Sequence, residues 1–320
     1  MSKFKDILYV FSDSTDNSQA LEKAVKVAKK NAAKLTVLFT LTDETMPDSL
    51  GFSKADIASF IEQKELERDK IIANYANIVV IEKDTLLSNA YHDVIEKVQE
   101  SGFDLLIKPT ENEGLLSRLF GSNDMGYLRQ CPCPVWLVNH AEVQNENTVV
   151  AAVDVSDNYP THEKEVRSKL NFDIALTAAY IAWSKGANLK FVSIWSSQYE
   201  NTLRDFGILK KSNEEVAEYI KEAEELHDSN FSKFIESVKS ELSDEQLTEL
   251  AIEGVSIKGA PREELPKYSG SINADLVVMG TVARVGIPGL IIGNTAENIL
   301  YRLNQSVLVL KPEGFDSLVD

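Results

Sequence analysis

The chain of 320 residues is poor in cysteine, histidine and tryptophan, of which it has two, four and three. Two cysteines are too few for a disulfide framework. Cys131 and Cys133 are separated only by Pro132, and at that spacing a bond between them would be strained. Because no other cluster of histidine or cysteine completes a metal site, we expect both to be small residues that open a buried strand.

The sequence also lacks long apolar runs and an excess of positive charge. None of its apolar runs reaches the ~18 residues that a membrane-spanning helix requires. The N-terminus has no apolar stretch followed by a small-residue cleavage site, so we expect a cytoplasmic protein. The net charge of -17 disfavours binding to nucleic acid or to anionic membranes. It does not disfavour a small anionic ligand that is held by backbone amides.

Sequence motifs of common catalysts are missing as well. There is no Gly-Lys-Ser/Thr of the Walker type, no Gly-x-Ser-x-Gly elbow and no His-Glu-x-x-His. A phosphoryl-transfer enzyme needs a metal-binding carboxylate, a neutralising cation and a group that orients the nucleophile. The most glycine-rich loop offers Arg284 as its one cation. We therefore expect no catalytic residues and no metal site, with slow ATP hydrolysis as an alternative.

What the sequence does contain is an internal repeat. Residues 104–110 resemble residues 275–281, and residues 7–14 resemble residues 149–156. In both halves a glycine and polar residues then precede a helix and a last apolar strand. Such repetition indicates two copies of one supersecondary unit. We expect the first domain to span residues 1–140 and the second to span residues 148–313, with a polar linker at 140–147.

Each copy alternates nearly unbroken apolar strands with helices, which is typical of a parallel sheet covered on both faces. The right-handed crossover rule then predicts an α/β fold with two tandem doubly wound parallel sheets. The expected helices include residues 18–31, 166–185 and 214–240. The expected strands of the first copy, after its opening strand, are residues 35–41, 78–81, 105–108 and 135–138, and those of the second are 189–194, 250–257, 276–279 and 307–310.

The last strand of the first copy, residues 135–138, is too apolar to be left at an exposed sheet edge. Prolines at 132 and 134 limit the backbone donors at its start. Pairing with residues 307–310 of the second copy would bury this edge within one chain. We therefore expect intramolecular pairing of the two domains, and further homodimerisation through other faces stays open.

Open α/β sheets bind ligands beyond the carboxyl ends of their strands, where the winding reverses. In the second copy this rule selects the loop after the first strand, with Asp154, and the glycine-rich segment after the fourth strand, from Gly280 to Gly289. That segment ends at Gly293, which opens a helix. Glycines let a backbone approach an anion, and free amides at a helix start attract phosphate. The pattern favours a bound phosphate chain.

The Asp that ends the first strand, Met279-Gly280 after the fourth, and Gly293-Asn294-Thr295 before the last helix together resemble the universal stress protein family, and its tandem E-type members in particular. The resemblance covers essentially the whole chain. It implies a five-stranded, Rossmann-like sheet per domain, of the adenine nucleotide alpha hydrolase-like type, with the domains packed as an intramolecular pseudo-dimer. It also implies a stress-response regulatory protein that binds ATP or AMP, accompanied by Mg²⁺.

The resemblance assigns roles to residues of the second copy. Gly280 and Gly293 match the first and third glycines of the family's ATP motif, whereas Ala283 replaces the second and Asn294 replaces a hydroxyl residue. Asp154 would face the ribose or base. The competing interpretation is a cap on the following segment for Asp154 and core packing for the apolar residues. The implied binding residues are Ala152, Val153, Asp154, Ile194, Met279, Gly280, Thr281, Ala283, Gly293, Asn294 and Thr295.

The first copy departs further from the motif. Pro109 stands where Gly280 stands, and it lacks the N–H and the backbone freedom that an anion-binding loop requires. Glu111 and Glu113 add negative charge. We expect no ATP binding there. Three functions remain open for the chain: a regulatory nucleotide binder without dedicated catalysis, a weak Mg²⁺-dependent ATPase, and a non-catalytic scaffold or carrier of a non-nucleotide, possibly apolar ligand; protein partners are not indicated.

Overall fold

The computed structural model describes residues 3–11, 15–41, 54–88, 90–111, 123–139, 147–156, 159–197, 199–205, 207, 210–281 and 292–315. The chain forms two compact units. Unit 1 holds residues 1–142, 281–293 and 304–320, and unit 2 holds residues 143–280 and 294–303. The last strand of the second sequence repeat thus belongs to the unit of the first repeat. Bounds of 1–140 and 148–313 stay our proposal for the repeats themselves.

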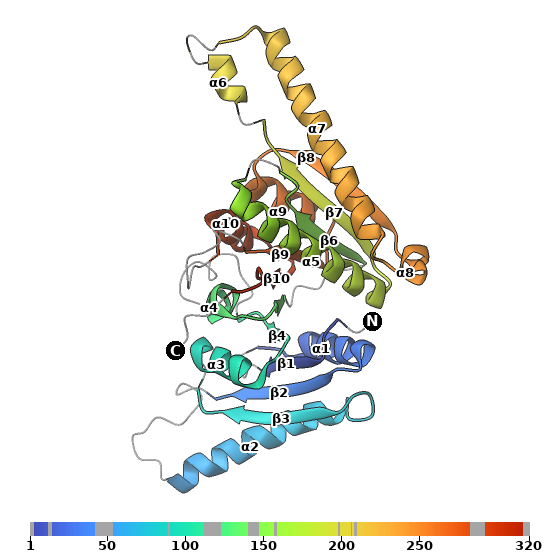
Figure 1. Ribbon diagram of the computed structural model, residues 1–320. Coiled ribbons are helices and arrows are strands. Elements are labelled where there is room, and N and C mark those ends of the chain that lie inside the picture. Colours follow the sequence, from blue (N-terminus) through green and yellow to red (C-terminus); the bar gives the residue numbers. More distant parts are fainter. Residues whose placement is uncertain are drawn as a thin grey trace. The chain divides into compact units, whose positions relative to one another are not determined.

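Among its described residues, unit 1 contains six strands in the order β3-β2-β1-β4-β5-β10 (Figure 1). The first five are parallel, and β10 is antiparallel to β5. Helix α1 packs on β1, β2 and β4, while α3 packs on α4. The elements are β1 Asp6–Phe11, α1 Ser18–Asn31, β2 Lys34–Thr40, α2 Lys54–Ala73, β3 Ile81–Leu86, α3 Tyr91–Ser101, β4 Leu105–Pro109, α4 Asn123–Gln130, β5 Val135–Val138 and β10 Ser306–Leu310.

In the described part of unit 2, four parallel strands lie in the order β9-β6-β7-β8. Helix α5 packs on β6, β7 and β9, and α9 packs on α10. Figure 1 shows α7 running past the strands of its unit, with α6 beside its first half. The elements are β6 Thr148–Val153, α5 Thr161–Lys185, β7 Asn188–Trp195, α6 Glu200–Asp205, α7 Asn213–Lys239, α8 Asp244–Glu249, β8 Ile252–Lys258, α9 Pro261–Ser271, β9 Leu276–Gly280 and α10 Asn294–Arg302.

These strands confirm the predicted fold class. Each repeat supplies five strands, β1–β5 and β6–β10, and the last strands of the two repeats pair as expected. The cysteines lie just before β5, both are buried and free, and their Sγ atoms are 3.5 Å apart. Across the part of the chain that the structure describes, no helix is both long enough and apolar enough to cross a bilayer.

Two helix starts are fixed by side-chain capping. Ser212 accepts a hydrogen bond from the amide of Glu215 at 3.2 Å, and the Glu215 carboxylate accepts one from the Ser212 amide at 3.0 Å. Ser243 and Gln246 repeat this reciprocal arrangement at the start of α8. Each pair satisfies amides that would otherwise lack a partner, so the local sequence determines where α7 and α8 begin.

Several sequence-based boundaries were wrong. The third strand was expected at residues 78–81, but β3 begins at Ile81 and continues through charged residues to Leu86. β3 is an edge strand, where exposed charge is tolerated, and Ile78 and Val80 lie before it with 43% and 80% of their surface exposed. Helix α5 starts at Thr161, directly after Pro160, rather than at residue 166. Helices α6 and α8 were not predicted.

The strand that precedes the glycine-rich loop is held close to α5. A Cβ on Gly280 would lie 2.7 Å from Cδ2 of Leu170 and 3.0 Å from Cδ1 of Ile174. The first contact is shorter than packed side chains permit, and the second is tighter than most such contacts. The absent side chain of Gly280 therefore allows β9 to approach α5, a packing role that the loop motif alone does not reveal.

Replacing Gly280 with alanine should lower the free energy of unfolding by about 1–3 kcal/mol, because the added methyl group overpacks the contact with α5. Urea unfolding measures the loss. Gly270→Ala is the matched control, since nothing lies within 4 Å of a Cβ at that helical position. In Gly280→Ala/Leu170→Val the two losses should be less than additive. Strict additivity would show that the clash with Leu170 is not the cause.

Candidate functional site

Three parallel strands of unit 2 bring their carboxyl ends to one edge. β6 lies between β9 and β7, so the residues that end these strands are neighbours at that edge. Asp154 follows β6 and is exposed, Ile194 is half-buried near the end of β7, and Gly280 ends β9. Val153 and Met279 are buried, and Ala152 is half-buried. The edge thus presents one exposed carboxylate above mostly buried apolar residues.

Asp154 is held by hydrogen bonds to both its backbone and its side chain. Asn171 on α5 accepts from the Asp154 amide at 3.0 Å and donates to the Asp154 carbonyl at 2.5 Å. The carboxylate accepts from the Ser156 amide at 3.0 Å and from the Tyr159 hydroxyl. Asp154 therefore forms a local turn rather than a helix cap, since α5 begins after Pro160 without a side-chain cap.

Tyr159 was not singled out from the sequence, although it lies only five residues after the predicted site residue Asp154. Burial, and then the charge of Asp154, raise the pKa of Tyr159 well above its usual range, so this hydroxyl keeps its proton. The Arg167 guanidinium lies over the Tyr159 ring at 3.9 Å from its centroid, and it pairs with Glu163 at 2.9 Å. Tyr159 is thus fixed as a hydrogen-bond donor to Asp154.

The two ends of the glycine-rich loop meet. Thr281 donates its amide to the Leu310 carbonyl at 3.2 Å, and Gly293 donates its amide to the Thr281 carbonyl at 3.1 Å. Helix α10 then begins at Asn294, and the side chains of Asn294 and Thr295 are exposed. Residues 282–291, with the predicted site residue Ala283, lie outside the described residues.

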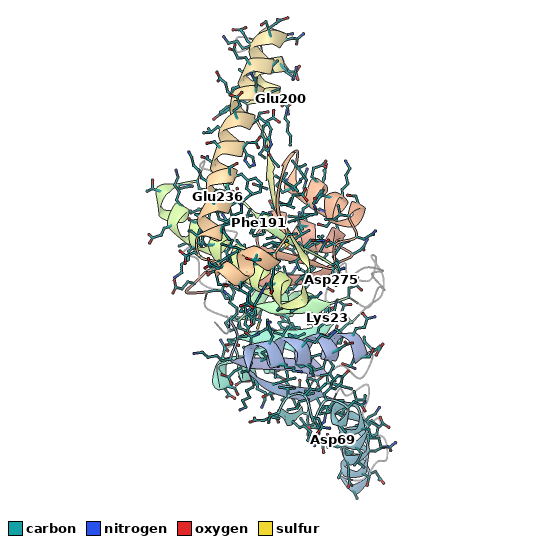
Figure 2. All side chains as sticks on the ribbon, turned by 90° about the vertical axis from the view of Figure 1, so that its right-hand side faces the viewer. Lys23, Asp69, Phe191, Glu200, Glu236 and Asp275 are labelled. Atoms are coloured by element: carbon teal, nitrogen blue, oxygen red, sulfur yellow. The ribbon has the colours of Figure 1, made fainter. Side chains whose placement is uncertain are left out.

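A cluster of large side chains, Trp195, His227 and Phe231, covers the end of β7. The His227 ring stacks on Trp195 and on Phe231, with centroids 5.9 and 6.1 Å apart. Lys258 lies over the Trp195 ring at 5.8 Å from its centroid and pairs with Glu200, labelled in Figure 2, at 2.6 Å. The bond to Lys258, together with bonds from Ser197 and Arg204, lowers the pKa of Glu200 to about 2.

His227 is the one histidine in this cluster among the described side chains, and no sequence motif marked it. It is 8% exposed, and its Nε2 has no hydrogen-bond partner. Burial lowers the pKa of His227, although the charges of Asp228 and Asp154 oppose the shift. The imidazole is therefore neutral at pH 7, because burial between aromatic rings disfavours the charged form more than the two carboxylates favour it.

Acid should destabilise the protein through His227. Its folded-state pKa is lowered, so unfolded chains bind the proton first as the pH falls from about 6.5, and stability is lost over that range and below it. His227→Phe keeps the ring packing but removes the titration. Denaturant unfolding between pH 7.5 and pH 5 should show a smaller loss of stability for His227→Phe than for the wild type. Parallel pH profiles would contradict this assignment.

In the first copy an ion pair lies between the fourth strand, β4, and the helix that follows it, α4. The Lys108 side chain, on β4, is 2% exposed, and its Nζ contacts the carboxylates of Asp124 and of Glu111, the latter at 3.1 Å. Asp124, in the first turn of α4, also accepts the Glu111 amide at 3.0 Å. Burial alone would lower the pKa of Lys108, but the two carboxylates outweigh it and raise that pKa. Asp124 thus joins the first turn of α4 to Lys108 and to the Glu111 amide.

Comparison of the repeats shows what replaces this ion pair in the second copy. The matched motifs align Lys108 with Met279 and Asp124 with Ala296. Met279 is 3% exposed and Ala296 is 7% exposed. One copy therefore has a cation and a carboxylate at two positions where the other has two buried apolar side chains.

The repeat supplies the substitutions that test this exchange. Lys108→Met alone should cost about 3–5 kcal/mol of unfolding free energy, because it leaves the Asp124 carboxylate largely buried without its cation. Lys108→Met/Asp124→Ala, which copies the second repeat, should recover most of that loss. Chemical denaturation of both single variants and the double variant measures the coupling. If the double variant were as unstable as the sum of the single ones, the pair would not act as a unit.

Within the described ranges, no three His, Cys, Asp or Glu side chains gather as they would to hold a metal ion. The model of the universal stress protein family matches residues 3–139 and, a second time, residues 171–311. The chain therefore belongs to the universal stress protein family and carries two of its domains in tandem.

Full-length relatives have the same organisation. The chain is 26% identical to the universal stress protein E homolog of Haemophilus influenzae over 98% of this chain and 99% of that protein. It is 23% identical to universal stress protein E of Escherichia coli K12 over 100% of this chain and 98% of that protein. The chain is thus similar to universal stress protein E from end to end.

Solved structures agree on the fold. A functionally unknown protein from Pseudomonas aeruginosa PAO1 matches with a TM-score of 0.60 and 25% identity over 98% of this chain and 94% of that one. A universal stress protein from Archaeoglobus fulgidus matches with a TM-score of 0.57 and 18% identity, over 96% of both chains.

Proposed function

We propose that the chain is a stress-response regulatory protein that binds an adenine nucleotide, ATP or AMP, in its second domain without dedicated catalysis. The observation that carries the proposal is the exposed carboxylate of Asp154 at the carboxyl edge of β9, β6 and β7, in a chain of the universal stress protein family. In open α/β sheets this edge is where nucleotides bind.

The hydrogen bonds of Asp154 support the proposal that its carboxylate binds the ribose of the nucleotide. Asn171 fixes its backbone, so the carboxylate keeps one position, and the partners at that carboxylate are an amide and the Tyr159 hydroxyl. A ribose hydroxyl is the same kind of donor as the tyrosine hydroxyl. The nucleotide would therefore exchange for Tyr159 at one carboxylate oxygen, and Tyr159 would compete with it.

The phosphate side of the proposal rests on the start of α10. The Gly293 amide donates to the Thr281 carbonyl, and α10 begins with the exposed residues Asn294 and Thr295. Free amides and the positive end of the helix dipole favour a phosphate there, with Mg²⁺ accompanying ATP. In the first copy Asp124 brings a carboxylate to the corresponding helix, which would repel a phosphate. The proposal is therefore one nucleotide per chain.

Calorimetric titration with Mg-ATP and with AMP tests the proposal. We expect micromolar binding at one site per chain and its loss in Gly293→Asp, which adds a carboxylate where phosphate would lie. Asp154→Asn should weaken binding about tenfold, because it removes a charged hydrogen-bond acceptor. Asp244→Asn is the matched control: it removes an exposed carboxylate at the start of α8, at the opposite edge of the sheet, and should leave the affinity unchanged.

Tyr159→Phe should tighten nucleotide binding several-fold, since Asp154 then loses its internal competitor. Thermal unfolding without ligand serves as the folding control for every variant. No binding heat in the wild type, or equal affinity in Gly293→Asp, would overturn the proposal. Release of inorganic phosphate at a rate that falls in Asp154→Asn would instead favour the weak ATPase.

A further inference from the structure

Unit 1 contains a cavity of about 310 Å³ at the carboxyl ends of β1 and β2, beneath α2. Its size falls at the lower end of the range of small-molecule sites. It lies in the copy whose glycine-rich loop has degenerated. We propose that this cavity binds a small aromatic carboxylate, independently of any nucleotide in the second domain.

The apolar wall of the cavity is aromatic. Phe11 ends β1 and Phe39 lies near the end of β2, and their rings meet edge to face with centroids 5.4 Å apart. Sheet register aligns these positions with Val153 and Ser193 of the second copy, so the aromatic pair belongs to the first copy alone. Ile71 on α2 closes the wall and is 38% exposed. Such rings favour a flat aromatic ligand over a branched aliphatic one.

Arg68 forms a further wall of the cavity and is held in place by hydrogen bonds. The Arg68 side chain is 5% exposed, and its guanidinium lies over the Phe39 ring at 5.7 Å from the centroid. It donates to the Asp84 carbonyl at 3.2 Å and to the Thr85 hydroxyl at 3.1 Å, and it pairs with Asp69, labelled in Figure 2, at 3.1 Å. These bonds to β3 and α2 fix the guanidinium plane as a flat surface on which an aromatic ring can stack.

The polar groups at the cavity favour a carboxylate over an amine. Both acids that line it already have partners: Asp16 accepts from the amide and hydroxyl of Ser18 at 2.9 and 2.8 Å, and Glu67 pairs with Lys64. The Lys64–Glu67 contact is 3.5 Å long, and the Glu67 side chain, which is 50% exposed, also accepts a long bond from Gln63 at 3.4 Å. Lys64 lies over the Phe60 ring as well, at 5.9 Å from its centroid. A ligand carboxylate can therefore displace Glu67 into water and take its place on Lys64.

A buried hydroxyl offers a second contact. Thr15 lines the cavity, and its Oγ1 is buried without a hydrogen-bond partner. A buried hydroxyl that lacks a partner costs free energy, and a ligand oxygen would supply the missing bond. The aromatic wall, the Lys64–Glu67 pair and the Thr15 hydroxyl together favour a small aromatic carboxylate as the ligand.

Three related probes test the proposal by calorimetric titration of the full chain: indole-3-acetate, uncharged 3-methylindole and cationic tryptamine. We expect saturable binding of indole-3-acetate at one site per chain, at least tenfold tighter than that of either other probe. Lys64→Gln should weaken indole-3-acetate binding about tenfold, since it removes the cation. Glu67→Gln should strengthen binding several-fold, because the competing carboxylate is gone.

Lys70→Gln is the matched control, with the same change of charge on an exposed part of α2 that does not line the cavity. It should leave the affinity unchanged, and Gly293→Asp should as well, which separates this site from the proposed nucleotide site. Equal affinity for 3-methylindole, equal effects of Lys64→Gln and Lys70→Gln, or no saturable binding of indole-3-acetate would each overturn the proposal.

Discussion

The antiparallel pairing of β5 with β10 is the contact on which unit 1 depends. All four residues of β5 are buried, and Leu308 of β10 lies opposite Trp136, which is 1% exposed. Without β10 this strand would present an apolar edge to water, and burying one large apolar side chain is worth about 1.5–3 kcal/mol. The last strand of the second repeat thus completes the sheet of the first.

Polar contacts on both sides of β10 reinforce this pairing. Asn139, which follows β5, donates its amide to the Ser306 hydroxyl at 3.2 Å and its side-chain amide to the Asn304 carbonyl. Lys311, directly after β10, donates to the carbonyls of Leu128 and Arg129 at the end of α4. A cation at a helix C-terminus satisfies carbonyls that lack partners and matches the helix dipole. The folding of the two repeats is therefore coupled, because the sheet of unit 1 is complete only when β10 of the second repeat has paired with β5.

The sequence predicted most of the buried elements and little of the edges. Helix α1 and strand β5 have the predicted bounds, because their apolar spacing matches the helical or strand period and their ends are marked by polar or proline residues. β3 was misplaced because the apolar residues before it resemble a strand more closely than its own charged sequence does. An edge strand is chosen by pairing with its neighbour, which a local pattern does not contain.

The same limit applies to the candidate site. The carboxyl edge on which we place it was predictable, since that edge follows from the order of strands and helices and the sequence repeat places Asp154 at the end of a strand. The partners of Asp154 were not, because Asn171 reaches it from the third turn of α5 and Tyr159 meets it only through the conformation of the intervening loop. The packing role of Gly280 also depends on the distance between β9 and α5, which no spacing of glycines specifies.

The two copies share the same order of strands and helices but differ in the polar side chain that they bury near the end of the second strand. Each copy buries a nitrogen-bearing side chain against an aromatic ring near the end of its second strand: Arg68 over Phe39 in the first copy and His227 over Trp195 in the second. Arginine keeps its charge in every accessible pH range, so the first copy needs the fixed bonds to Asp69, Asp84 and Thr85. Histidine can shed its proton, so the second copy leaves His227 neutral without any partner at Nε2.

This difference has consequences for ligands. In the first copy the Arg68 guanidinium, bonded to β3 and to Asp69, forms one wall of the cavity. A neutral imidazole between two aromatic rings adds no charge to the second copy's edge, where Asp154 is then the exposed charge nearest the end of β6 among the described side chains. The helix after the fourth strand also differs in charge between the copies, with Asp124 in the first turn of α4 and Ala296 at the matching position of α10. The two edges therefore differ in charge and in aromatic lining, although they follow the same order of strands and helices.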